Sequence, residues 1–245
     1  MKFFITGGSR GLGAALVLRA VAASHEVAFT YRSNEASALA VVAEARALVP
    51  DCHVQCYALD VRFADQVEAV GDRVVDDFET VDVVVNNAGV SRPNLAVTMS
   101  DEEWDEVLAT NLTGAFYVCR TFLPILMSND GGRIINVSSI VAQGMSGMVN
   151  YAAAKAGLIG LTKTLAKEYG RKKITANVLL PGHFDTDMQM SDRMQSFWRD
   201  FAPVPKGRAG QRDELADLIL FLSSPAAAFI NGETIHMTGG LDWTP

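Results

Sequence analysis

The chain has 245 residues, of which 49% are hydrophobic and 20% are charged, and this composition suits one soluble globular domain. Its net charge of −7 at pH 7 argues against nucleic acid and anionic membrane surfaces as partners, because both are negatively charged. Glycines and arginines interrupt the N-terminal apolar run, which therefore does not fit a signal peptide, and the three cysteines suggest neither a disulfide scaffold nor a metal site. We therefore expect a cytoplasmic protein without a metal.

Short apolar runs alternate with longer amphipathic runs along the chain, and several short runs are almost entirely apolar. Such runs are typical of parallel strands that helices cover on both faces. Repeated strand–helix–strand units predict an α/β fold, with one Rossmann-type domain over residues 1–245 and a doubly wound, parallel, seven-stranded sheet. The predicted strands are 3–6, 27–30, 53–59, 81–85, 133–137, 175–180 and 234–237, and the predicted helices are 12–23, 35–48, 64–78, 101–111, 112–127, 151–169 and 214–222.

The first predicted turn, within FFITGGSRGLG at 3–13, fits two different motifs. Residues 7–11 match G-x-S-x-G, in which Ser9 would be the nucleophile of a serine hydrolase. The same glycines match a turn that lets the backbone approach phosphates at a helix N-terminus. We favour a dinucleotide site, because the turn directly follows the first strand and the later histidines lack a distinctive context. Its predicted cofactor-binding residues are Gly7, Ser9, Arg10, Gly11, Leu12 and Gly13.

The end of the second predicted strand bears on the choice of cofactor. Folds that bind NAD usually place an acidic residue there to hold the ribose hydroxyls. This strand continues as Tyr31-Arg32-Ser33, without an acid. Arg10 and Arg32 could instead bind a 2′-phosphate, because guanidinium groups make bidentate contacts with phosphate oxygens. The sequence therefore favours NADP(H), although two solvated surface arginines are the simpler interpretation.

A long insertion at about 183–210 interrupts the regular alternation before the last helix. It follows a strand end, where sheets of this kind bind their ligands. A substrate flap and a surface helix packed on the core are equally supported. Its methionines and aromatic residues could cover an acyl chain, because thioether side chains adapt to apolar ligands. They are Met188, Met190, Met194, Phe197, Trp198 and Phe201.

Four further stretches accompany TGGSRGLG in a fixed order: NNAG at 86–89, INVSS at 135–139, YAAAK at 151–155 and PGHFDTDM at 181–188. Together they resemble the classical short-chain dehydrogenase/reductases, and the resemblance runs from residue 2 to about residue 240. Within that family the sequence is most similar to the 3-oxoacyl-[acyl-carrier-protein] reductases, on account of YAAAKAGL, PGHFDTDM and FINGETIHMTGG.

The resemblance implies four catalytic residues. Tyr151 would be the proton donor, Lys155 would hold the nicotinamide ribose, and Ser139 would hydrogen-bond the substrate carbonyl. Asn111 would hold a water of the proton relay to Lys155. Tyr151 and Lys155 are four residues apart and so share one helix face, from which a nearby ammonium would be expected to lower the pKa of the phenol.

The choice of serine depends on how the family pattern is aligned. Ser139 lies 12 residues before Tyr151, one fewer than the commonest family spacing, which would select Ser138. Alignment on the strand GRIINVSS selects Ser139, and we prefer it because a missing residue is more easily absorbed in a loop. In an extended chain the two hydroxyls point in opposite directions, so that only one can serve.

The resemblance also implies further cofactor contacts, to the adenine, the ribose and the nicotinamide carboxamide. Asp60 and Val61 would contact the adenine, and Asn87, Ala88 and Gly89 would line the ribose. Pro181, Gly182 and Thr186 would contact the carboxamide, and Tyr151 and Lys155 also belong to the cofactor-binding residues.

The predicted activity is NADPH-dependent reduction of a 3-oxoacyl thioester, on acyl carrier protein, in fatty-acid or related polyketide-type biosynthesis. One departure puts carrier docking in doubt: Asp130 stands where the carrier-protein reductases have a basic residue, although Arg171, Lys172 and Lys173 remain basic. The alternatives are a reductase or dehydrogenase of a free small ketone or alcohol, and a non-catalytic partner subunit on the same fold. The family implies a homotetramer or homodimer that pairs through the helices at 112–127 and 151–169.

Overall fold

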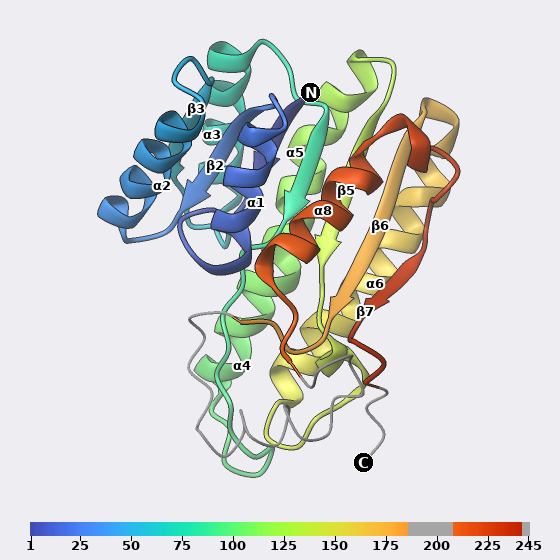
Figure 1. The fold of residues 1–245 in the computed structure, drawn as a ribbon. Coiled ribbons are helices and arrows are strands. Elements are labelled where there is room, and N and C mark those ends of the chain that lie inside the picture. The colour runs from blue at the N-terminus through green and yellow to red at the C-terminus, as the bar shows by residue number, and fades with distance from the viewer. Residues whose placement is uncertain (186–207, 242–245) are drawn as a thin grey trace.

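Seven parallel strands form one sheet in the order β3-β2-β1-β4-β5-β6-β7 (Figure 1). The structure is a computed structural model that describes residues 1–185 and 208–241. The strand order reverses between β1 and β4, which makes the sheet doubly wound as predicted. The strands are β1 (Lys2–Ile5), β2 (Glu26–Tyr31), β3 (Val54–Ala58), β4 (Val83–Asn86), β5 (Gly132–Val137), β6 (Ile174–Pro181) and β7 (Thr234–Met237).

Helices cover both faces of the sheet and bury two separate apolar layers (Figure 1). One face carries α1 (Gly11–Ala22), α2 (Glu35–Leu48) and α8 (Arg212–Ser223). The other carries α3 (Ala64–Phe78), α5 (Gly114–Ser128) and α6 (Val149–Tyr169), while α4 (Asp101–Leu108) lies beyond the ends of the strands. Short helical turns follow at η2 (Ile140–Gln143), η3 (Gly170–Lys172) and η4 (Pro225–Ala227).

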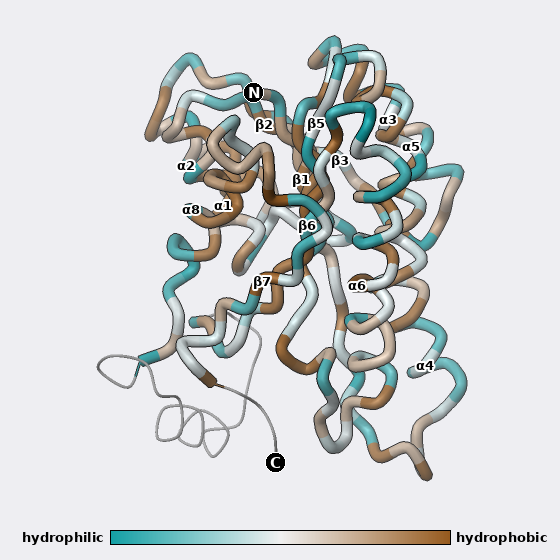
Figure 2. Tube along the Cα trace, turned by 90° about the vertical axis from the view of Figure 1, so that its right-hand side faces the viewer, coloured by the Kyte–Doolittle hydropathy of each residue, from teal (hydrophilic) through white to brown (hydrophobic). Residues whose placement is uncertain are grey.

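The strands contribute to both layers because successive side chains point to opposite faces. Phe3 and Ile5 of β1 pack in the layer under α1 and α2, whereas Phe4 packs in the opposite layer, where it stacks on Phe122 with ring centroids 4.2 Å apart. Figure 2 shows the hydrophobic colour of β1 and α1 along the chain trace. Burial on both faces explains why the strands are short and almost entirely apolar.

The predicted strands and helices are present, and their ends differ from the prediction by at most two residues, apart from the end of the helix predicted at 101–111. The main difference lies between 101 and 128. The two helices predicted there are joined by a π-helical segment, η1 (Ala109–Thr113), so that the chain continues from α4 into α5 without a break. Hydrophobic periodicity did not predict this segment, because a single wider turn shifts the apolar face without any stop residue.

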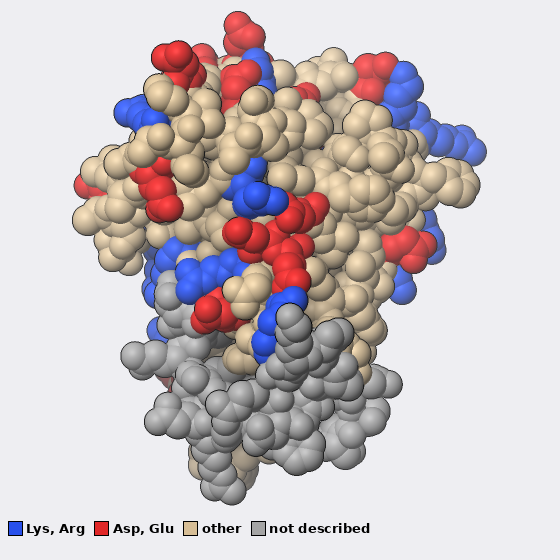
Figure 3. All heavy atoms as spheres, viewed as in Figure 1, with Lys and Arg blue, Asp and Glu red and all other residues tan. Residues whose placement is uncertain are grey.

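Charges of both signs are intermixed on the face shown in Figure 3, down the middle of the molecule. The ion pairs of α8 include Arg19–Asp217, which joins α1 to α8, and Arg208–Glu214 at the start of α8. The three cysteines are free thiols. Among the helices of residues 1–185 and 208–241, none is long and apolar enough to cross a membrane.

A buried polar chain crosses from the sheet to α6. The Asn86 amide donates to Asn136 Oδ1 at 2.8 Å, and the Asn136 amide donates to Thr162 Oγ1 at 2.8 Å. The Thr162 hydroxyl in turn donates to the Leu158 carbonyl at 2.6 Å. This chain fixes α6 against β4 and β5, because a buried amide without its partner would lose its hydrogen bond without gaining one from water.

Replacement of this threonine tests how much the chain stabilises the fold. We expect Thr162→Val to lower the free energy of unfolding by about 1–3 kcal/mol, because it leaves the buried Asn136 amide without an acceptor. The matched control is Thr164→Val, whose hydroxyl is exposed on the same helix and donates only to Gly160 O. Urea denaturation of both variants measures the difference, and equal losses of stability would contradict the assigned role.

Candidate active site

The turn after β1 has the backbone shape of a phosphate-binding turn. Gly7 and Gly11 have φ of 68° and 58°, a region that glycine adopts without strain. A side chain at Gly13 would place its Cβ 2.2 Å from Gly7 O, so α1 can pack this closely only with glycine there. Ser9 and Leu12 are half-buried beside the turn and Arg10 is exposed. The free N–H groups at the start of α1 therefore face an open turn, as an anionic ligand requires.

Side chains of Thr6 and Asn87 connect the ends of β1 and β4. Thr6 Oγ1 accepts from the backbone N–H groups of Asn87 and Ala88, both at 3.0 Å. The Asn87 amide donates to the carbonyls of Thr6 and Gly7, also at 3.0 Å. These bonds bring the predicted ribose-binding segment, Asn87 to Gly89, against the glycine turn.

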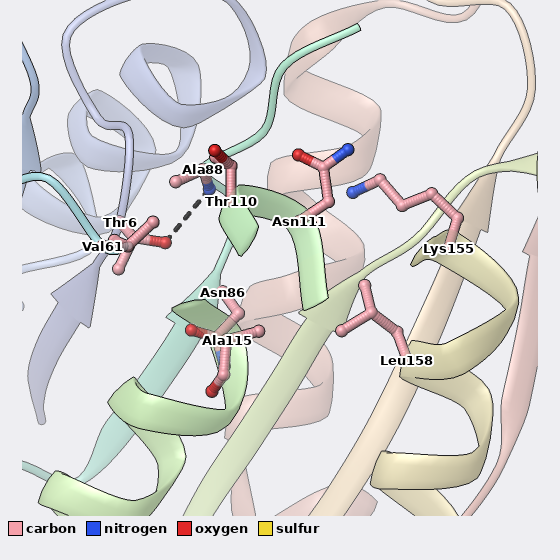
Figure 4. Close-up of a pocket in the computed structure, with 9 residues that line it drawn as sticks. All are labelled: Thr6, Val61, Asn86, Ala88, Thr110, Asn111, Ala115, Lys155 and Leu158. Carbon is pink, nitrogen blue, oxygen red and sulfur yellow. Dashed lines mark hydrogen bonds between the residues drawn. The ribbon is translucent and has the colours of Figure 1, made fainter. Parts of the chain in front are cut away.

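The ends of β2 and β3 carry charged residues. Arg32 follows β2 and is half-exposed, with its Nη1 3.5 Å from Glu106 Oε1. Asp60, after β3, accepts a bidentate ion pair from Arg62 at 2.6–3.1 Å. That hydrogen bonding, with a smaller contribution from the charge of Arg32, lowers the pKa of Asp60. Val61 is buried next to it and lines the pocket drawn in Figure 4.

The π-helical segment sets the position of Asn111. Its amide donates to Val90 O at 2.9 Å, and its Oδ1 accepts from Val90 N at 2.8 Å. Figure 4 shows the Asn111 amide and the Lys155 amine side by side at one end of the pocket. A Cβ at Gly89 would lie 3.2 Å from Asn111 Oδ1 and 3.7 Å from Lys155 Nζ, so the glycine keeps this space clear.

Lys155 is a buried amine, with 3% of the residue exposed. Its Nζ donates to Val137 O at 2.7 Å, at the end of β5. Burial lowers its pKa to about 8, because the charged form loses its hydration. Ser138 is also buried, and its hydroxyl donates to Lys155 O at 2.8 Å, so it faces the backbone of α6.

Tyr151 lies one helical turn before Lys155, whose Nζ is 5.5 Å from the centroid of the tyrosine ring. The expectation of a lowered phenol pKa is wrong for this structure: burial raises the pKa of Tyr151 to about 12, against a smaller opposing effect of its hydrogen bond with Ser139. The desolvation of the phenol therefore outweighs the hydrogen bond with Ser139 in setting this pKa. Ser139, not Ser138, is the serine that lies beside the tyrosine.

Asn150 was not among the predicted site residues. It is fully buried, and its Oδ1 accepts from the backbone N–H of Tyr151 at 2.7 Å. Its amide donates to Arg92 O and to Glu103 O, both at 3.1 Å. The side chain thus attaches the start of α6, which bears Tyr151, to α4. The only signal in the sequence was a polar residue next to the tyrosine at a predicted helix start.

Apolar side chains surround the tyrosine on its other side. Ile140, Val141 and Leu241 form a small buried cluster, against which Met145 and Met148 pack together with Tyr151. Pro181 ends β6, and Gly182 N donates to Met237 O at 3.0 Å, so both lie at the same edge of the sheet. Thr186 and the named methionine and aromatic residues of the predicted flap lie outside the described residues.

Comparison with known proteins places this arrangement among oxidoreductases. Residues 7–242 match the family model described as Enoyl-(Acyl carrier protein) reductase. The chain is 39% identical over 241 residues to a 3-oxoacyl-[acyl-carrier-protein] reductase FabG of Staphylococcus aureus, covering 97% of this chain and 96% of that protein. It is likewise 39% identical to the Escherichia coli protein of that name, covering 97% and 95% of the two chains.

A solved structure has the same architecture. The crystal structure of levodione reductase superposes with a TM-score of 0.91 at 30% sequence identity, covering 98% of this chain and 96% of the other. A further FabG, from Vibrio cholerae, is 44% identical over 185 residues, covering 75% of this chain and 76% of that protein.

The buried amine makes stability depend on pH. The drop in the pKa of Lys155 from 10.5 to about 8 means that the buried charge lowers the free energy of unfolding by about 3 kcal/mol at neutral pH. Between these two values the unfolded chain binds more protons than the folded one, so the stability of the natural protein rises with pH. We expect its free energy of unfolding, minus that of Lys155→Met, to increase by about 2–3 kcal/mol from pH 7 to pH 10.

Denaturant titrations at pH 7, 8.5 and 10 without ligands test this dependence. The control is Lys163→Met, which removes an exposed lysine from the same helix and should give a curve parallel to that of the natural protein. Parallel curves for Lys155→Met as well would show that Lys155 is not a costly buried charge.

Proposed function

The chain belongs to the short-chain dehydrogenase/reductase family of oxidoreductases, and on that premise we propose that it reduces a 3-oxoacyl thioester to the 3-hydroxyacyl form with NADPH. The family membership confirms the resemblance predicted from the motifs and overturns the hydrolase hypothesis for Ser9. The observation that carries the proposal is the convergence of Ser139, Tyr151, Lys155 and Asn111 at the carboxyl edge of the sheet.

The glycine turn fits a dinucleotide, because a Cβ at Gly11 would meet no atom of the described residues within 4 Å, which leaves space for phosphates at the N-terminus of α1. Arg10 and the half-exposed Arg32 suit a 2′-phosphate, and no acid follows β2. Bound NADPH would supply the hydride, and Lys155 with Asn87, Ala88 and Gly89 would hold its ribose. Pro181, Gly182 and Thr186 would contact the carboxamide, which orients the nicotinamide ring.

The protein residues would supply the proton and the stabilisation of charge. The Ser139 hydroxyl would donate a hydrogen bond to the ketone oxygen as negative charge develops there. The raised pKa of Tyr151, about 12, keeps the phenol protonated at neutral pH, which suits the donor in a reduction. Lys155, whose pKa is about 8, would return a proton to the phenolate, and Asn111 would complete the path to solvent.

The proposed substrate follows from the surroundings of Tyr151 and from the relatives. The cluster with Met145 and Met148 offers an apolar and adaptable wall for an acyl chain. The FabG relatives are named for 3-oxoacyl groups on acyl carrier protein, so the proposed pathway is fatty-acid or related polyketide-type biosynthesis. Arg171 and Lys172 are exposed and would attract an acidic carrier.

One observation favours the second candidate, reduction of a free small ketone. Asp130 is exposed and forms an ion pair with Lys173, which reduces the positive charge available to a carrier protein. Levodione reductase, whose structure is similar, is named for a small ketone.

We also propose a homo-oligomer and a cytoplasmic location. Phe116 and Met127 are partly exposed on α5, and such apolar side chains suit an interface formed by helices of two subunits.

Loss of the tyrosine hydroxyl tests the catalytic assignment. We expect Tyr151→Phe to lower turnover by about 10²–10⁴-fold while NADPH still binds, because only the proton donor is removed. The loss of NADPH absorbance would be followed with the same acetoacetyl group on acyl carrier protein, on coenzyme A and as a simple ester. Much faster turnover with the carrier would support a carrier-protein reductase, and equal rates a free-ketone reductase.

Tyr169→Phe is the matched control, because this tyrosine ends the same helix at its opposite end and should leave turnover unchanged. Turnover by Tyr151→Phe within about tenfold of the natural protein would exclude Tyr151 as the proton donor, because general acid catalysis contributes more than that.

Charge removal at Asp130 tests carrier docking. We expect Asp130→Asn to raise kcat/KM for the carrier-bound substrate about two- to fivefold, because it releases the Lys173 ammonium and removes a like charge from the carrier's path. The coenzyme A substrate serves as internal control and should not respond. An equal response from both substrates would mean that this surface does not receive the carrier.

A further inference from the structure

The carboxylate of Glu106 lies between two arginines from different parts of the chain. Its Oε1 is 3.5 Å from Arg32 Nη1, after β2, and its Oε2 is 2.8 Å from Arg92 Nε, in the segment after β4. Glu106 itself belongs to α4. The glutamate side chain is 21% exposed, whereas the two arginines are 45% and 48% exposed. One partly buried anion is therefore shared between two half-exposed cations.

The two ion pairs are unequal. The contact with Arg92 has the length of a charge-assisted hydrogen bond, and Asn150 anchors the backbone of Arg92 through its carbonyl. The contact with Arg32 is longer, at 3.5 Å, so it is the weaker of the two. If an anion approached this surface, Arg32 is the partner that could leave Glu106.

Arg32 is also the residue to which the proposed function assigns the 2′-phosphate. Two carboxylates already interact with Arg32. Glu106 forms an ion pair with it, and the charge of Arg32 contributes to the lowered pKa of Asp60. A phosphate monoester brings nearly two further negative charges at pH 7. Binding it would require Arg32 to give up Glu106, and the carboxylate would remain nearby as a like charge.

We propose that Glu106 is a specificity-determining residue that competes with the 2′-phosphate of NADPH for Arg32 and so narrows the preference for NADPH over NADH. This inference rests on the proposed function. Arg92 moderates the competition, because it holds the same carboxylate from the other side. If Glu106 had only a structural role, it would hold α4 to the segment of Arg92, and its replacement would change the affinities for NADPH and NADH equally.

Cofactor binding to the complete chain tests the proposal through opposite responses. Dissociation constants for NADPH and NADH would be measured by titration at low salt. Glu106→Gln keeps the size and removes the charge, so we expect NADPH to bind about two- to fivefold more tightly while NADH changes little. Arg92→Gln frees the carboxylate for Arg32, so we expect NADPH to bind more weakly by a similar factor.

Two controls isolate the effect. Asp105→Asn removes the same charge one residue earlier on α4, from an exposed position, and should not change the ratio of the two constants. In an Arg32→Gln background, Glu106→Gln should no longer change the affinity for NADPH, because the guanidinium for which Glu106 and the phosphate compete is gone. High salt should weaken all these differences.

The outcomes separate the inference from the proposal beneath it. If Arg32→Gln leaves the ratio of NADPH to NADH affinity unchanged, the assignment of Arg32 to the 2′-phosphate fails. If Arg32→Gln lowers the ratio but Glu106→Gln does not raise it, only the competition is overturned. Weaker NADH binding in Glu106→Gln would also overturn it, because the carboxylate would then be accepting hydrogen bonds from the ribose hydroxyls.

Discussion

The hydrogen bonds around Thr6 and Asn87 join the ends of β1 and β4, where the strand order of the sheet reverses. The strand order reverses between β1 and β4, so the segments that follow these two strands diverge to opposite faces and leave a crevice. Four bonds of 3.0 Å join the two strand ends across it. They add side-chain bonds to the last backbone bond between the two strands, from Thr6 N to Val85 O at 3.0 Å. The glycine turn and the segment from Asn87 to Gly89 take their positions from this junction.

Beyond the junction, the four proposed catalytic groups come from three structural elements. Ser139 follows the end of β5, α6 carries Tyr151 and Lys155, and the π-helical segment presents Asn111. Wider turns of this kind often occur at functional sites, where they redirect one side chain within an otherwise regular helix. The buried amine opposes folding at neutral pH. Groups with strongly shifted pKa values cluster at functional sites, which agrees with the proton-relay role proposed for Lys155.

The sequence was sufficient for the fold and for most of the site, because both depend on local patterns. Apolar runs identify strands buried on both faces, and the motifs place polar groups at the strand ends. What it could not supply depends on packing between distant segments. The pKa of Tyr151 is set by desolvation, the clamp of Asn150 joins α6 to α4, and Glu106 meets Arg32 across more than seventy positions of chain. No spacing within a motif predicts these contacts.

The two ends of the segment between serine and tyrosine are held independently. The register of β5 turns Ser138 toward α6 and Ser139 toward the tyrosine, while Asn150 fixes the tyrosine from the side of α4. Neither anchor involves the number of residues between them. A lineage can therefore lengthen or shorten this connection without disturbing the distance between the two hydroxyls. The spacing of 12 in this chain is therefore compatible with contact between Ser139 and Tyr151, and a search pattern that fixes a different interval would reject it.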